Sequence, residues 1–219
     1  MIQGANEWIQ DIHCNAVEHG WWEQNRSMEE VLALIHSEWS EALEEDRAGR
    51  PMVWHGCKAN GEIYPCESCP DCAEKDRSNA WDAGRCPDYL DKPEGIAVEL
   101  VDGCIRIMDW FGKCGYAVLL GSIEHLGEIG VGEFENLVNA PVPSLVAHLH
   151  HITSKALLLD EKRLVLEQNR RDKISNMYLM QVLEIVFGWL MKRGLDPEEI
   201  LKEKHLYNVT RPYKHGKQY

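Results

Sequence analysis

The sequence predicts an all-α fold, a bundle of five or six helices. Three observations predict it. Apolar residues occupy one arc of the helices that can be drawn through the chain, pairs of start and stop signals bracket those helices, and no alternating apolar strand pattern persists over a useful length. The chain has 219 residues, which is enough for one or two compact domains with a core.

The first two helices are predicted within residues 5–48. The first covers residues 5–23 and closes near Gly20. Ser27 followed three residues later by Glu30 forms a capping box that starts the second helix. Gly49 and Pro51 end that helix after about residue 48.

Residues 51–90 differ in composition from the helical segments on either side. They contain five cysteines and four prolines, and no helical period survives there. We therefore expect an irregular Cys-rich insertion at 51–90 between two parts of one helical bundle, residues 1–50 and 91–219.

The remaining helices follow from local signals. Pro93 and Glu94 open a helix that runs to about Lys113 and stops at Gly115. Residues 116–142 are expected to hold a short helix and a loop. Further helices are predicted at 143–159, at 173–192 before Gly194, and at 197–208 behind an Asp196 cap, with a frayed tail at 214–219.

Two acidic pairs stand out on the predicted helices. Glu38 lies inside the apolar arc of its helix and Glu41 lies at the edge of that arc, while Glu99 and Asp102 share one face of a later helix. A carboxylate on a core-facing arc is costly unless something compensates it. Divalent cations such as Mg²⁺ compensate it with oxygen ligands; the alternative is a solvated face whose acids pair with Lys or Arg.

Convergence of the two pairs would favour phosphoryl chemistry. Four carboxylates brought together repel one another, and repel a triphosphate, unless cations lie among them. Metal ions in such a site neutralise charge and orient an attacking water.

These motifs resemble those of the MazG-like, all-α nucleoside triphosphate pyrophosphohydrolases. The resemblance rests on Glu38-Trp39-Ser40-Glu41, on residues 92–102 ending in Glu99-Leu100-Val101-Asp102, and on the closing segment 204–216. It implies a MazG-like bundle in which Glu38, Glu41, Glu99 and Asp102 hold Mg²⁺, with Mn²⁺ as an alternative. A water would then attack between the α- and β-phosphates and release a monophosphate and pyrophosphate.

The closing segment supplies the expected phosphate contacts. Lys204, Asn208 and Arg211 are spaced i, i+4, i+7, which is one face if the helix persists, and two cations and an amide suit an anionic substrate. The alternative is a basic helix end that complements the helix dipole. The sequence departs from the family pattern at Ser37, where the family often has a second Glu. The set of metal ligands on this helix is then smaller, or Glu45 contributes a ligand.

The segment between the second acidic pair and the closing segment suggests an internal repeat. If Gly194 aligns with Gly115, Gln181 aligns with Asp102 and Tyr178 with Glu99. The second copy would have lost its acids, and one chain would mimic a two-subunit assembly with a single active centre.

The cysteine cluster suggests a structural Zn²⁺ site, since zinc is held by four Cys or His ligands and often by CxxC halves. The expected ligands are Cys57, Cys66, Cys69 and Cys86. Cys72 is the rival third ligand and His55 a sixth candidate, while an iron–sulfur cluster and unligated cysteines remain alternatives.

The composition restricts the classes of molecule that the protein is expected to bind. The net charge is −13, which disfavours binding to polymeric nucleic acid because such binding depends on Lys and Arg. No 18-residue apolar run and no signal-like N-terminus is seen, so we expect a cytoplasmic protein without membrane contact. The sequence therefore predicts a Mg²⁺-dependent enzyme that cleaves small-molecule nucleoside triphosphates; the alternative is a non-catalytic, zinc-stapled module that binds a nucleotide or a protein. A homodimer is the alternative to a bundle completed within one chain.

Overall fold

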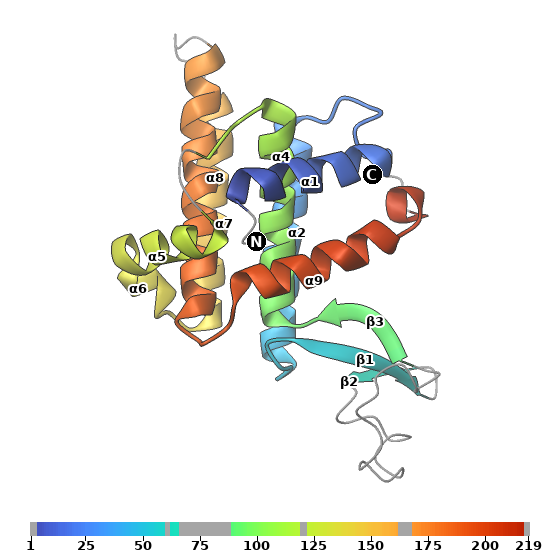
Figure 1. Cartoon of the computed structure of the whole chain (residues 1–219). Helices are drawn as coiled ribbons and strands as arrows, with labels where there is room; N and C mark the ends of the chain where they lie inside the picture. The colour runs from blue at the N-terminus through green and yellow to red at the C-terminus, as the bar shows by residue number, and fades with distance from the viewer. Residues whose placement is uncertain (1–3, 60–61, 66–88, 119–121, 162–167, 217–219) are drawn as a thin grey trace.

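The computed structural model describes residues 4–59, 62–65, 89–118, 122–161 and 168–216, and within them it is mostly helical, as the sequence predicts (Figure 1). The described helices and strands are α1 (Ala5–Glu18), α2 (Met28–Arg47), β1 (Trp54–Ala59), β2 (Glu62–Pro65), β3 (Tyr89–Glu94), α4 (Ile96–Cys114), α5 (Ile123–Glu133), α6 (Glu135–Val138), α7 (Val142–Glu161), α8 (Gln168–Met191), α9 (Pro197–Thr210) and the short 3₁₀ helix η4 (Tyr213–Gly216).

Helix α4 lies at the centre of the molecule. It packs against α1, α2, α8 and α9, and twelve of its nineteen residues are buried. In Figure 1, α1 and α9 cross in front of α4, while α2 runs behind it. A residue on any face of α4 therefore meets another helix, which is why the polar residues of α4 matter for the site.

Several helix ends lie where local chemistry places them. The Ser27 hydroxyl accepts a hydrogen bond from the Glu30 amide, and the Glu30 carboxylate accepts one from the Ser27 amide, so the predicted capping box is confirmed. The Asp196 carboxylate caps α9 by accepting hydrogen bonds from the amides of Glu198 and Glu199, and Pro197 occupies the first helical position. Gly115, at φ 61°, ends α4.

The expectation of an irregular segment at 51–90 is wrong for the residues that form β1, β2 and the start of β3, because these strands make a small antiparallel sheet. β1 pairs antiparallel with β2 on one side and with β3 on the other, in the order β2-β1-β3. The expected helix start at Pro93 is also wrong, because Pro93 lies in β3 opposite His55. An edge strand tolerates proline, which lacks an amide hydrogen.

Helix α4 instead begins after Gly95. This residue has φ 116°, and a Cβ atom on it would lie 2.6 Å from the Met52 carbonyl oxygen. That carbonyl accepts a hydrogen bond from the Ala97 amide at 2.9 Å. Glycine is therefore required where the sheet meets the helix.

Each half of the chain packs two helices on a third. α1 and α2 pack on α4, whereas α5 and α7 pack on α8, and α2 packs on α7 between the two sets. Gly115 and Gly194 both have a left-handed conformation after α4 and α8. The internal repeat stays a prediction from the sequence.

Helix α8 also carries the most apolar stretch of the described chain. The window Ile174–Met191 is long and apolar enough to cross a membrane by length and composition, but 61% of it is buried inside the protein. Burial of this kind is usual for the core helix of a globular domain.

The frayed tail expected at 214–219 is wrong for residues 214–216, while residues 217–219 lie outside the described residues. The Lys214 amide donates to the His19 carbonyl oxygen, and its ammonium lies 3.2 Å from the Glu23 carboxylate. These contacts hold η4 against the end of α1.

Candidate metal centre

The site forms where α2 and α4 approach each other closely. Gly103 on α4 faces the Trp39 ring on α2, and a Cβ atom on Gly103 would lie 2.3 Å from that ring. Trp39 is fully buried and donates its indole N–H to the Thr153 hydroxyl at 3.1 Å. The missing side chain at Gly103 lets the helices approach closely, and the adjoining acids Glu38 and Asp102 lie near each other.

Three carboxylates converge at this contact. Glu38, Glu99 and Asp102 each offer one oxygen, and these oxygens lie within 4.8 Å of one another. Glu38 is 3% exposed and Glu99 is 4% exposed. Mg²⁺ binds oxygen at about 2.1 Å, so two ligands on opposite sides of one ion are about 4.2 Å apart. Small side-chain rotations would bring the three groups onto a single ion.

Two cations from the chain contact two of these acids. Arg106, one turn after Asp102, places Nε and Nη2 each 2.6 Å from Oε1 of Glu38. Lys204 from α9 is buried and places Nζ 3.3 Å from Oδ2 of Asp102. Within the described residues, no hydrogen bond or ion pair reaches the carboxylate of Glu99.

Burial and mutual repulsion change how these acids ionise. Burial, followed by the charge of Asp102, raises the pKa of Glu38 to about 7 although Arg106 opposes the rise. Burial, with added repulsion from Asp102 and Glu38, raises the pKa of Glu99 to about 8 against the opposing charge of Lys204. Such a site takes up protons unless a metal ion replaces them.

Asp102 behaves in the opposite way. Burial alone would raise its pKa, but the charges of Lys204 and Arg106 and a hydrogen bond from Lys204 outweigh burial and lower it. Asp102 is therefore the member of the cluster that stays ionised.

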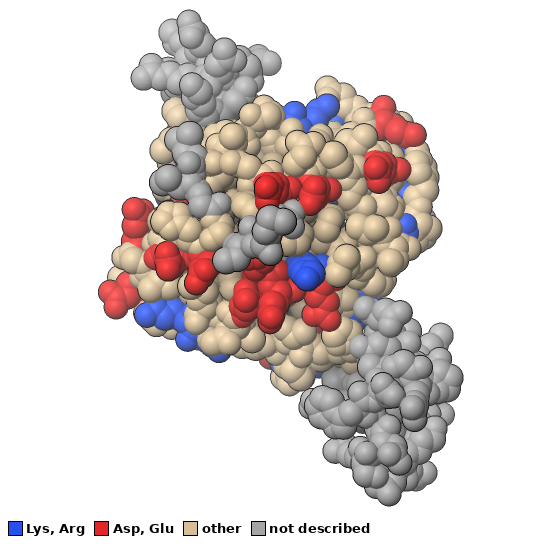
Figure 2. All heavy atoms as spheres, in the orientation of Figure 1, with Lys and Arg blue, Asp and Glu red and all other residues tan. Residues whose placement is uncertain are grey.

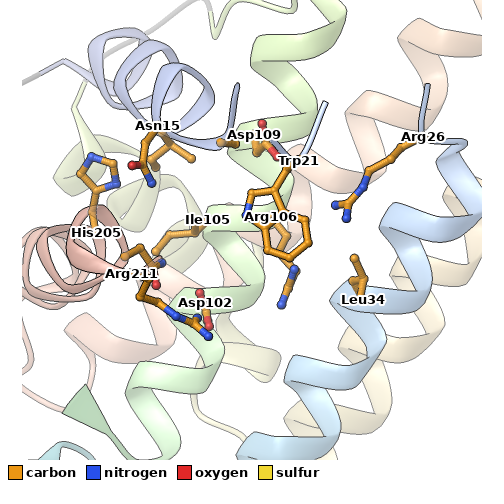
Figure 3. Close-up of a pocket in the computed structure, with 13 residues that line it drawn as sticks. Asn15, Trp21, Arg26, Leu34, Asp102, Ile105, Arg106, Asp109, His205 and Arg211 are labelled. Atoms are coloured by element: carbon orange, nitrogen blue, oxygen red, sulfur yellow. The ribbon is translucent and has the colours of Figure 1, made fainter. Parts of the chain in front are cut away.

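A pocket opens beside Asp102, the member of the carboxylate cluster that lines it. Its walls come from four parts of the chain, and Figure 3 shows their side chains around one space. Three arginines line it: Arg26 before α2, Arg106 on α4, and Arg211 after α9. Asn15, Trp21 and His205 line it as well.

Asn208 of α9 also lines the pocket, and its side chain is incompletely satisfied. It is 8% exposed, and its Oδ1 atom is buried with no hydrogen-bond partner among the described residues. A buried acceptor without a donor is rare and costly. A ligand donor that reached this atom would remove that cost.

Comparison of the chain with protein-family models, curated proteins and solved structures gives no match. The resemblance to MazG-like enzymes therefore stays an expectation from the sequence motifs.

Six of the predicted site residues lie at or beside the carboxylate cluster. Glu38, Glu99 and Asp102 come together, and Lys204, Asn208 and Arg211 lie against them or line the adjoining pocket. Arg211 does so although α9 ends at Thr210, because the chain turns into an extended conformation there.

Two further acids lie outside the cluster. Glu41 is exposed and accepts a hydrogen bond from the Ser37 hydroxyl at 3.0 Å. Glu45, the suggested extra ligand, accepts instead from the Trp54 indole N–H at 2.7 Å. It therefore anchors the start of β1 rather than the metal centre.

The predicted zinc site cannot be traced onto the structure. Cys66, Cys69, Cys72 and Cys86 lie outside the described residues, and only the backbone of Cys57 is described, in β1. Zinc binding by this segment stays a prediction. His55, the sixth candidate ligand, pairs with Glu203 of α9 at 2.8 Å.

The sequence analysis did not single out Arg106 and Asp109, which follow Asp102 along α4. Arg106 contacts Glu38, and Asp109 accepts hydrogen bonds from His13 and from the Trp22 indole N–H. The i, i+4 spacing of Asp102 and Arg106 was the available signal. Arg26 lies far away in sequence, and only the folded chain brings it to the pocket.

Proposed function

We propose that this chain is a Mg²⁺-dependent nucleoside triphosphate pyrophosphohydrolase of the MazG-like type. It would cleave a (deoxy)nucleoside triphosphate and water to the monophosphate and pyrophosphate. The observation that carries the proposal is the convergence of three carboxylates, two of them nearly fully buried, beside a pocket lined by arginines.

The charge pattern supports an anionic substrate rather than a nucleic-acid polymer. Acidic side chains spread over much of the face in Figure 2, and basic ones lie in a few places. A polyanion would be repelled by such a surface. A single triphosphate needs only the pocket, where Arg26, Arg106 and Arg211 are gathered.

In the proposed reaction Glu38, Glu99 and Asp102 hold Mg²⁺, and exposed Glu41 at the edge contributes charge or a water-mediated contact. The metal ion would supply charge neutralisation of the phosphates and lower the pKa of a bound water. Asp102, whose pKa is lowered, is ionised and ready to bind at neutral pH. Arg211 and Asn208 would steady the phosphates and the groups around them.

One observation favours a competing proposal, a non-catalytic nucleotide-binding module. Glu38 and Asp102 each already have a cationic partner, which is also how purely structural ion-pair networks are built. A module of this kind would bind the triphosphate in the arginine-lined pocket and release it unchanged.

Product analysis separates the two proposals. The purified chain is incubated with a panel of NTPs and dNTPs plus Mg²⁺, and the products are followed by ³¹P NMR. We expect pyrophosphate and a monophosphate, and reaction in ¹⁸O-labelled water identifies the attacked phosphorus. Glu38→Gln and Asp102→Asn should each lower the rate by at least about 10²-fold. The matched control is Glu44→Gln, since Glu44 is exposed and pairs only with Arg47 at the surface.

The binding-module proposal predicts other results. Equilibrium dialysis would show bound triphosphate, and NMR would show no product after long incubation with any member of the panel. Release of inorganic phosphate and a diphosphate would contradict the pyrophosphohydrolase proposal directly, because it requires cleavage at a different bond.

A further inference from the structure

Arg106 is placed to act as a permanent cation of the metal centre. Its Nε and Nη2 atoms both donate to one oxygen of Glu38, Oε1, which leaves the second oxygen free for another partner. About one third of its side chain is exposed, and it lines the pocket. The guanidinium therefore contacts Glu38 with one edge, and its remaining N–H groups are available to a ligand in the pocket.

The net charge of the cluster limits how many metal ions it can hold. Three carboxylates meet two cations, Arg106 and Lys204, which leaves one negative charge in the buried group. Exposed Glu41, close enough to affect Arg106 electrostatically, adds a second. Arg211 also acts electrostatically on Asp102, so the group carries one or two negative charges. One divalent ion offsets them, whereas a second ion would leave an uncompensated excess of positive charge in a mostly buried site, which is costly.

The unsatisfied Asn208 side chain is a second, independent sign of a ligand. Its Oδ1 atom is buried without a hydrogen-bond partner among the described residues, and the residue lines the same pocket as Asp102. Mg²⁺ keeps several of its waters, and metal-bound water is a strong hydrogen-bond donor. A water on an ion held by Asp102 is a donor of the kind that this side chain lacks.

We propose that the centre binds one divalent cation, through Glu99, Asp102 and the free oxygen of Glu38, and that Arg106 takes the place of a second metal ion. This inference rests on the proposed function. It assigns to Arg106 the role of contacting the phosphate chain while the guanidinium stays bound to Glu38. The substrate class is therefore a nucleotide whose phosphates are bound jointly by one metal ion and one guanidinium.

Metal stoichiometry tests the proposal. Mn²⁺ is the probe because its free ion is counted by electron paramagnetic resonance and because it prefers oxygen ligands to thiolates. We expect one tightly bound Mn²⁺ per full-length chain, two in Arg106→Gln, and one in Arg106→Lys, which keeps the charge. Arg47→Gln is the control, because Arg47 is an exposed residue paired with Glu44, and it should bind one.

Activity gives an independent readout. In Arg106→Gln we expect pyrophosphate release to fall about 10²-fold and its Mg²⁺ dependence to change from first order to second order. Guanidinium ion added to the medium should restore part of the rate. Circular dichroism of each variant checks that the fold persists.

The outcomes distinguish the two proposals. Two equivalent Mn²⁺ ions in the wild type, both lost in Glu99→Gln, would overturn the single-ion proposal and leave the proposed function intact. A stoichiometry of one in Arg106→Gln would also overturn it. No Mn²⁺ bound by the wild type, or binding unchanged in Glu99→Gln, would refute the metal centre itself and with it the proposed function.

Discussion

Replacing Glu99 by Gln should stabilise the metal-free protein at neutral and alkaline pH. Glu99 is almost fully buried, and burial together with repulsion from Asp102 and Glu38 raises its pKa from the ordinary 4.5 to about 8. Gln has nearly the same shape but carries no charge. The variant therefore removes the cost of ionising this group in the folded state.

The size of the effect follows from the pKa rise. An increase from 4.5 to about 8 corresponds to roughly 5 kcal/mol, at about 1.36 kcal/mol per pKa unit. Glu38 can take up the shared proton when Glu99 ionises, which relieves part of this cost. We expect a gain of about 2–4 kcal/mol at pH 8, or about 4–16 °C in Tm for a chain of this size.

The dependence on pH has a definite sign. A carboxyl group with a raised pKa contributes its stability fully below pH 4.5, and this contribution is lost as pH rises through about 8. Wild type and Glu99→Gln should therefore have similar free energies of unfolding near pH 4.5 and should differ most at pH 8. The increase between these values is the signature of ionisation, and a change in packing would not reproduce it.

Urea unfolding with a chelator present measures the effect. The control variant is Glu44→Gln, at an exposed position, which should match the wild type at both pH values. Mg²⁺ at 1,000 times its Kd should offset this difference, since it stabilises the wild type by about 4.1 kcal/mol and the variant by much less. A Glu99→Gln protein that is less stable than the wild type at pH 8 without metal would refute the reasoning.

Three other substitutions test separate parts of the structure. Lys204→Met leaves Asp102 buried without its cation and should lower the free energy of unfolding at pH 7 by about 3–5 kcal/mol, measured in urea; no change would mean that the pair at 3.3 Å is unimportant. Gly103→Ala forces a methyl group toward the Trp39 ring and should cost about 1–3 kcal/mol, with a shift in tryptophan fluorescence. Ser27→Ala removes the cap of α2 and should cost about 1 kcal/mol, while Ser40→Ala on the exposed face of α2 should cost less.

Local chemistry explains why the helix ends were predictable. The Ser27 box, the Asp196-Pro197 start and the glycine after α4 act through groups within four residues, so the sequence alone contains the whole interaction. Pro93 shows the limit of this reasoning. Proline suits both a first helical turn and an edge strand, and the choice depends on pairing with His55, nearly forty residues earlier.

The same distinction applies to the metal centre. Glu38 was predicted to be buried because it lies inside an apolar arc, and it is buried. Its partner Arg106 comes from another helix, and helical spacing carries no information about contacts between helices. Glu41 lay at the edge of the arc and is exposed, so the arc distinguished the two acids correctly.

The pocket could not be derived in this way. Trp21 and Arg26 come from the segment between α1 and α2, and His205 comes from α9. Their meeting depends on how α1 and α9 cross α4. Asn208 was selected from a resemblance, but its unsatisfied oxygen is visible only in three dimensions.

The glycine at position 103 has a consequence for ion selectivity. Because Gly103 brings α2 against α4, the gap between their carboxylates is determined by packing one residue away from the ligands. Mg²⁺ needs oxygens at about 2.1 Å and Ca²⁺ accepts about 2.3–2.6 Å. A side chain at this position would spread the two helices, so a folded Gly103→Ala protein should favour the larger ion with every coordinating residue unchanged.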